Sequence, residues 1–144
     1  MNCARNIRTP EVLCLQREAL LEAERHKWIE SQKLGRDVGL PAIAEWYNRY
    51  WPMYCREKRL EHLRGSRCWD EFTDEQFGHL YSLIVAGDLL VDRILDRVYA
   101  GYENLDIINW AFDWGLNIDR VIEILSQLDV NRARLDPLPN VASC

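Results

Sequence analysis

The chain has 144 residues, of which 48% are hydrophobic and 28% charged, and its formal net charge is −5. This balance is typical of a folded globular protein and argues against intrinsic disorder. The apolar runs fall well short of the roughly 18 residues that a membrane span requires, so we expect a protein with no membrane partner.

The first half of the chain predicts two long helices joined by a tight corner. Residues 10–34 show helical spacing of apolar residues, with Thr9 as the capping residue and a proline at the first helical position. Gly35 and Gly39 bracket the corner, and a second helix begins near residue 40. Pro52 lacks a backbone N–H and is expected to break or kink this helix, which then continues to about residue 63.

The second half predicts several shorter helices. Thr73 opens a capping box that predicts a helix up to Gly87, and Asp88 and Asn117 are capping residues for helices over 89–100 and 118–128. A further helix is expected over 102–114. We therefore predict an all-α fold, a compact single-domain bundle of five to seven helices over residues 1–134, with an irregular C-terminal tail at 135–144.

Cysteine usage and the absence of motifs restrict the choice of compartment and cofactor. The five cysteines are odd in number and include no Cys-x-x-Cys pair, which argues against structural zinc and favours free thiols in a reducing compartment. Neither a signal peptide nor a glycine-rich phosphate loop is visible. We expect a cytoplasmic protein with no cofactor, no resident metal and no identifiable catalytic residue.

The stretch HKWIESQKLGRDVG, residues 26–39, contains the most distinctive motif of the chain. It is similar to a segment of uncharacterised bacterial proteins with the pattern His-[Lys/Arg]-Trp-x-x-Ser-[Glu/Gln]-x-x-Gly-Arg-Asp-x-Gly. The resemblance covers about a tenth of the chain and implies no activity, but it suggests that Gly35-Arg36-Asp37 is a structured corner. His26 and Glu30 share a helix face and could bind a metal or act in acid–base chemistry, although ordinary pairing on a solvated face is the favoured interpretation.

Residues 47–67 combine basic and aromatic side chains. Six bases and two acids lie between Arg49 and Arg67, and tyrosines and tryptophan interleave with them. Bases with aromatic rings suit single-stranded nucleic acid, through phosphate neutralisation and base stacking. The spacing of the rings is also that of a helix stripe facing the core, and this second interpretation is favoured.

Charge distribution and aromatic content together favour recognition of another protein. Residues 1–69 carry 13 bases and 9 acids, whereas residues 70–144 carry 5 bases and 14 acids. We therefore expect a non-enzymatic interaction or accessory subunit that binds a protein partner, in a larger complex or a homo-oligomer. The alternatives are a nucleic-acid-associated protein, which is less favoured, and a small metal-binding helical enzyme using His26, Glu30 and His62. The expected partner-binding residues are His26, Trp28, Glu30, Arg36, Asp37, Trp46, Arg49, Tyr50, Trp51, Arg56, Arg59, Arg67 and Trp69.

Overall fold

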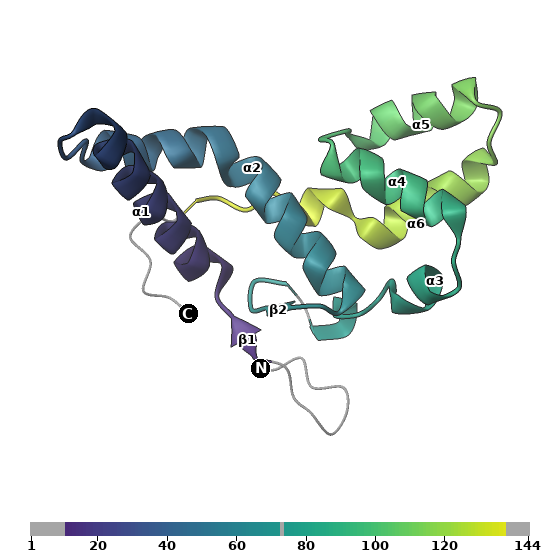
Figure 1. Cartoon of the computed structure of the whole chain (residues 1–144). Coiled ribbons are helices and arrows are strands. Elements are labelled where there is room, and N and C mark those ends of the chain that lie inside the picture. Colours follow the sequence, from purple (N-terminus) through teal and green to yellow (C-terminus); the bar gives the residue numbers. More distant parts are fainter. Residues whose placement is uncertain (1–10, 73, 138–144) are drawn as a thin grey trace.

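Helices dominate the structure, a computed structural model that describes residues 11–72 and 74–137 (Figure 1). Six α-helices and two two-residue strands lie in these residues, which confirms the all-α prediction and the expected number of helices. The elements in chain order are β1 Val12–Leu13, α1 Leu15–Leu34, α2 Leu40–Arg64, β2 Cys68–Trp69, the 3-10 helix Asp74–Gln76, α3 Tyr81–Val85, α4 Leu89–Tyr99, α5 Asn104–Asp113, α6 Ile118–Leu128 and the 3-10 helix Val130–Ala133.

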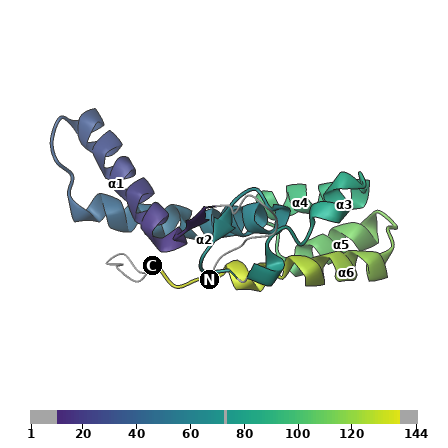
Figure 2. The ribbon, with the colours of Figure 1, turned by 90° about the horizontal axis from the view of Figure 1, so that it is seen from below.

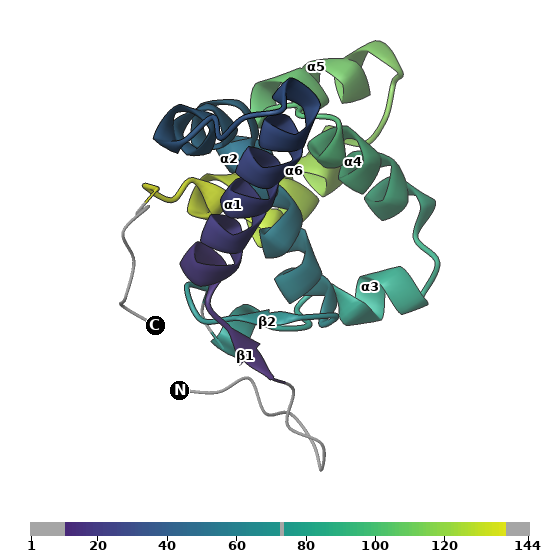
Figure 3. The ribbon, with the colours of Figure 1, turned by 60° about the vertical axis from the view of Figure 1, so that its left-hand side comes forward.

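Helix α1 begins at Leu15, later than the sequence predicts, because the residues before it pair with a distant strand. Strands β1 and β2 are parallel, with Val12 opposite Cys68, and they lie side by side in Figure 3. The Glu71 carboxylate, which follows β2, accepts the backbone N–H groups of Leu15 at 2.8 Å and Gln16 at 3.0 Å. It thereby satisfies donors that every helix leaves unpaired in its first turn. The expected cap Thr9 lies outside the described residues.

Helix α2 is the central helix of the molecule. It runs for 25 residues without interruption through Pro52, and it bends along its length as expected for a helix with an internal proline (Figure 1). Its first half packs against α1, and its second half contacts α3 and α4. Seen from below, α1 lies at one end of the molecule and α3 to α6 at the other, with α2 between them (Figure 2).

The described residues bury two main apolar clusters, and α2 contributes to both. The cluster at the α1 end contains Leu15, Ala19, Ala23, Trp46, Tyr47, Trp51, Cys55, Trp69 and Phe72. The other cluster joins Leu60 and Leu63 of α2 to the inward faces of α4, α5 and α6. The rings of Tyr47 and Trp51 are therefore core side chains. The stripe predicted from the spacing of residues 43, 47, 50 and 54 is confirmed at Tyr47 but not at Tyr50, which is 41% exposed.

The single helix predicted over residues 73–86 is replaced, from residue 74 on, by a 3-10 helix and the five-residue α3, and its predicted cap Thr73 lies outside the described residues. Gly78 separates the two pieces with a positive φ of 72°, a conformation that ends a right-handed helix. Its backbone also lies close to that of Gly65, where an added Cβ would come within 3.2 Å of the Gly78 Cα. The Gly78 N–H donates to the His62 carbonyl at 2.9 Å, so this crossing joins the end of α2 to the chain before α3.

The predicted capping residues of α4 and α6 are confirmed. The Asp88 carboxylate accepts the N–H groups of Leu90 at 3.0 Å and Val91 at 3.4 Å, and the Asn117 side chain accepts that of Arg120 at 3.2 Å. The Arg120 guanidinium also pairs with Asp88 at 2.8 Å, which ties the start of α6 to the start of α4. This ion pair holds the pKa of Asp88 below its usual range.

The chain after the last 3-10 helix has no helix or strand up to residue 137, but it is held to the core. The carbonyl of Leu135 accepts the indole N–H of Trp51 at 2.7 Å, and the carbonyl of Asp136 accepts the side-chain amide of Gln16 at 2.9 Å. The predicted tail at 135–144 therefore begins as an anchored segment. Residues 138–144 of that tail lie outside the described part.

Cysteine chemistry differs from the prediction of free thiols. Cys14 and Cys68 are each part of a disulfide, whereas Cys55 is a buried free thiol. Disulfides persist mainly in oxidising compartments, so the cysteines give no support to a reducing location. Taken over the described residues, the helices include none with the length and apolar character needed to cross a bilayer.

Candidate functional site at the tip of the α1–α2 hairpin

The corner between α1 and α2 is fixed by hydrogen bonds that its own backbone and side chains accept. The Ser31 carbonyl accepts the backbone N–H groups of Gly35 and Arg36, and the Ser31 hydroxyl accepts that of Val38 at 3.1 Å. The Asp37 carboxylate accepts the N–H of Gly39 at 2.9 Å, which turns the chain into α2. The corner is thus locally determined, and this accounts for a serine, a glycine and an aspartate at these positions.

An open pocket of about 560 Å³ lies against this corner. Seven of the nine residues that carry the sequence motif line it: Lys27, Trp28, Ser31, Gln32, Gly35, Arg36 and Asp37. The motif residues therefore form one surface, since the end of α1 and the corner present them to the same hollow. Trp28 is 62% exposed and supplies an apolar wall.

Charges at the tip are uneven. On α1, Arg25 pairs with Glu22 and Lys33 pairs with Glu30, so these acids and bases largely cancel. Lys27, Arg36 and Arg49 form no ion pair with any of the described residues. The tip also exposes Leu34 and Leu40 beside the corner. A tryptophan next to unpaired cations suits a ligand that is both apolar and acidic.

A second group of side chains lies where α1 faces the first half of α2. The His26 Nε2 atom is 2.8 Å from the Glu45 Oε1 atom, and Glu30 lies one helical turn beyond His26. One ligand atom from each of these three residues falls within 4.8 Å of the others. The Tyr50 ring packs against the His26 ring at a centroid distance of 5.9 Å. Glu45 is the member of this group that the sequence analysis did not identify.

His62 does not join His26 and Glu30. It is fully buried in the second half of α2, and its Nδ1 atom accepts the backbone N–H of Trp69 at 3.1 Å. Its ring contacts Phe72 and Phe77. The suggested grouping of His26, Glu30 and His62 is therefore wrong, and His62 is a core residue that holds β2 against α2.

Five of the expected partner-binding residues are buried, which corrects the expectation that they lie on a recognition surface. They are Trp46, Trp51, Arg56, Arg59 and Trp69. The tryptophans fill the apolar cluster at the α1 end, and the arginines bind backbone carbonyls. Of the remaining positions, Arg36, Asp37, Arg49, Tyr50 and Trp28 are exposed near the hairpin, and Arg67 is exposed beyond the far end of α2.

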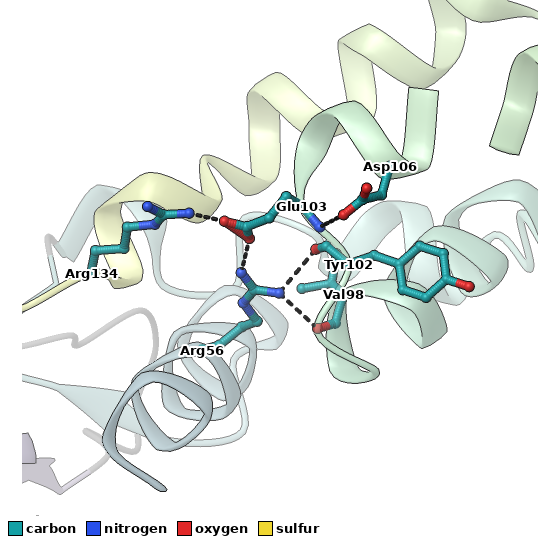
Figure 4. Close-up of polar contacts among 6 residues, drawn as sticks. All are labelled: Arg56, Val98, Tyr102, Glu103, Asp106 and Arg134. Atoms are coloured by element: carbon teal, nitrogen blue, oxygen red, sulfur yellow. Dashed lines mark hydrogen bonds and ion pairs between the residues drawn. The ribbon is translucent and has the colours of Figure 1, made fainter. Parts of the chain in front are cut away.

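Arg56 ties α2 to the turn between α4 and α5 (Figure 4). Its guanidinium donates to the carbonyls of Val98 at 3.3 Å and Tyr102 at 2.9 Å, and it pairs with Glu103, which also pairs with Arg134. Burial lowers the pKa of Arg56. A pocket of about 420 Å³ adjoins this network, and both of its lining arginines share the single carboxylate of Glu103, which leaves the lining with one net positive charge.

Arg59 has a similar structural role on the next turn of α2. It is 1% exposed and donates to the carbonyls of Leu128 at 2.9 Å and Asp129 at 3.0 Å. These contacts satisfy the end of α6, where helix carbonyls lack partners. Burial lowers the pKa of Arg59 to about 10. The basic aromatic segment 47–67 thus exposes few rings, and two of its arginines bind backbone carbonyls inside the protein. Most of the ring surface and part of the positive charge that the nucleic-acid alternative requires are therefore not accessible.

Exposed apolar side chains at the opposite end of the molecule were missed by the sequence analysis. Leu105, Phe112 and Trp114 are each more than 65% exposed, on and just after α5. The seven-residue spacing of Leu105 and Phe112 places them on one helix face. Ile107 and Ala111, on the opposite face of the same helix, are fully buried. The spacing of apolar residues along 104–113 could therefore have shown from the sequence that this helix has a second apolar face.

Comparison of the chain with protein-family models, curated protein sequences and solved structures gives no match.

Proposed function

We propose that the protein is a non-enzymatic interaction subunit that binds a protein partner through the tip of the α1–α2 hairpin. The observation that supports this most directly is the pocket whose lining coincides with the motif residues around Trp28 and Arg36. The corner that carries it is fixed by Ser31 and Asp37, so the surface is preorganised and little conformational entropy is lost when a partner binds.

The chemistry of the tip favours an acidic partner segment with an apolar side chain. Lys27 precedes Trp28 in the sequence and Arg36 follows it, and both line the pocket together with the Trp28 ring. Neither Lys27 nor Arg36 has an ion-pair partner in the described part of the chain. An acidic residue of the partner would pair with these cations, and its apolar neighbour would pack on the indole ring. Arginine and tryptophan are residue types that often dominate binding energy at protein interfaces.

The test is a comparative capture experiment with immobilised protein and a lysate of the source cells. The variants Trp28→Ala and Arg36→Glu are expected to lose a protein that the wild type retains, because each removes one part of the pocket. The control is Trp114→Ala, since Trp114 is 71% exposed but lies beyond α5, at the other end of the molecule. Melting temperatures of all variants should match the wild type, because exposed substitutions change stability by only about 0.5 kcal/mol.

The proposal fails if the same proteins are retained by Trp28→Ala, Arg36→Glu and the wild type.

Light scattering of the purified chain tests self-association, because a second copy presenting its acidic half is one source of the partner chemistry. A labelled single-stranded oligonucleotide tests the nucleic-acid alternative. Binding that is strong at low salt and falls steeply with added salt would favour that alternative over a protein partner.

A further inference from the structure

We propose that His26, Glu30 and Glu45 form a binding site for one first-row divalent metal ion, with Zn²⁺ as the ion best suited to it. The site would join α1 to α2 just below the hairpin tip. The grouping comes from two helices: His26 and Glu30 lie four residues apart on α1, and Glu45 reaches them from α2. The inference is independent of the proposed protein partner.

The spacing on α1 is that of paired metal ligands on a helix. Residues at i and i+4 lie on the same helix face, and two ligands with this spacing hold zinc in many helical metal sites. A third ligand must come from another element, and Glu45 supplies it because α1 and α2 pack closely along the hairpin. A ligand from each helix makes the hairpin itself the scaffold of the site.

The distances need only side-chain adjustment. Zinc lies about 2.0–2.2 Å from nitrogen and oxygen ligands, so two ligands of a tetrahedral site are about 3.3 Å apart. The His26 Nε2 and Glu45 Oε1 atoms are 2.8 Å apart, and all three ligand atoms lie within 4.8 Å of one another. Rotations that move the ligand atoms by roughly 1 Å therefore bring the group to the required geometry.

The surroundings orient the imidazole and leave the carboxylates free to move. The His26 side chain is largely buried, and the Tyr50 ring packs against its ring in an edge-to-face arrangement. Glu45 is half exposed, and among the described residues Glu30 forms its ion pair with Lys33, at 3.1 Å in an exposed i,i+3 pair. Such a surface pair contributes about 0–1 kcal/mol and is readily replaced by a metal ion.

The donor set determines the class of ion. One imidazole nitrogen and two carboxylate oxygens suit Zn²⁺, Mn²⁺, Fe²⁺ or Co²⁺ better than Mg²⁺ or Ca²⁺, which prefer ligand sets made only of oxygen. Three protein ligands leave a fourth position for water or an external ligand, as in open zinc sites. That position would face solvent on the side of the exposed Glu45.

The experiment uses the full chain after treatment with EDTA and desalting. Titration with Co²⁺ is expected to give visible d–d absorption that saturates at one equivalent, and Zn²⁺ is expected to displace it and to raise the melting temperature. Glu30→Gln and Glu45→Gln should each weaken Co²⁺ binding at least tenfold, whereas the control Glu24→Gln, an exposed acid on α1, should leave it unchanged. Circular dichroism confirms that each variant is folded.

Three results would overturn the inference. They are the absence of stoichiometric binding, binding that neither Glu30→Gln nor Glu45→Gln weakens, and strong near-ultraviolet charge-transfer bands, which would assign the ion to cysteine thiolates. The variant Trp28→Ala separates this inference from the proposed function. It should lose the protein partner while binding Co²⁺ as the wild type does, so each conclusion stands or falls on its own measurement.

Discussion

Replacement of Trp51 by alanine tests whether the aromatic rings of α2 form the core. Trp51 is 5% exposed, contacts the rings of Tyr47 and Tyr54, and donates its indole N–H to the Leu135 carbonyl. A buried tryptophan covers roughly 150–250 Å², and truncation of such a residue to alanine costs about 3–5 kcal/mol. The carbonyl left without its donor adds about 1 kcal/mol.

This loss is a large part of the total stability, which for a domain of this size is on the order of 5–15 kcal/mol. The assay is urea unfolding followed by far-ultraviolet circular dichroism, with Trp114→Ala as the control because its ring is exposed. If Trp51→Ala does not fold, Trp51→Phe should retain the fold with a loss of about 1–3 kcal/mol, from the smaller ring together with the unpaired carbonyl. A loss below about 1 kcal/mol for the alanine variant would refute the core assignment.

Three further predictions follow from the same structure. Under native conditions at neutral pH Cys55 should not react with a thiol reagent, because burial raises its pKa to about 12. Unfolding without reductant should expose Cys55 to the reagent. Cys14 and Cys68 should stay unreactive until their disulfides are reduced. Both Gly65 and Gly87 have a positive φ, so replacing either with alanine should cost about 1–2 kcal/mol of stability. Gly65→Ala should be the more destabilising of the two in urea unfolding, because its added Cβ would also lie 3.2 Å from a neighbouring backbone atom. Asp88→Asn keeps a capping oxygen but loses the charge that pairs with Arg120. Because the folded state lowers the pKa of Asp88, its charge stabilises the protein above about pH 4, and this contribution is lost as the pH falls through the lower native pKa. Urea unfolding as a function of pH should therefore show a shallower acid loss in this variant.

Local signals in the sequence were sufficient to place the helices that begin with a strong capping residue. Asp88 and Asn117 mark the starts of α4 and α6 because each side chain satisfies N–H groups only two or three residues away. The start of α1 was placed too early because it depends on β2 and Glu71, more than 50 residues later in the chain. Spacing along one segment contains no information about such a distant contact.

The candidate site was predictable in part. The motif residues around Trp28 form a surface because the corner is built from neighbouring residues. Glu45 could not be paired with His26 from the sequence, since that pairing depends on how α1 and α2 pack across the hairpin. The burial of Arg59 had a visible signal: it follows Trp51 and Cys55 at steps of four residues and continues their inward stripe. Its charge led to the wrong expectation that it faces a partner.

The sharing of α2 between the two apolar clusters has a consequence for how the chain loses its structure. A break near the middle of α2 would leave Trp46 and Trp51 on one fragment and Leu60 and Leu63 on the other, so each fragment would keep only part of the helix that completes its core. The two ends should therefore melt in one cooperative step, and amide hydrogens in the central turns of α2 should exchange only when the whole molecule opens.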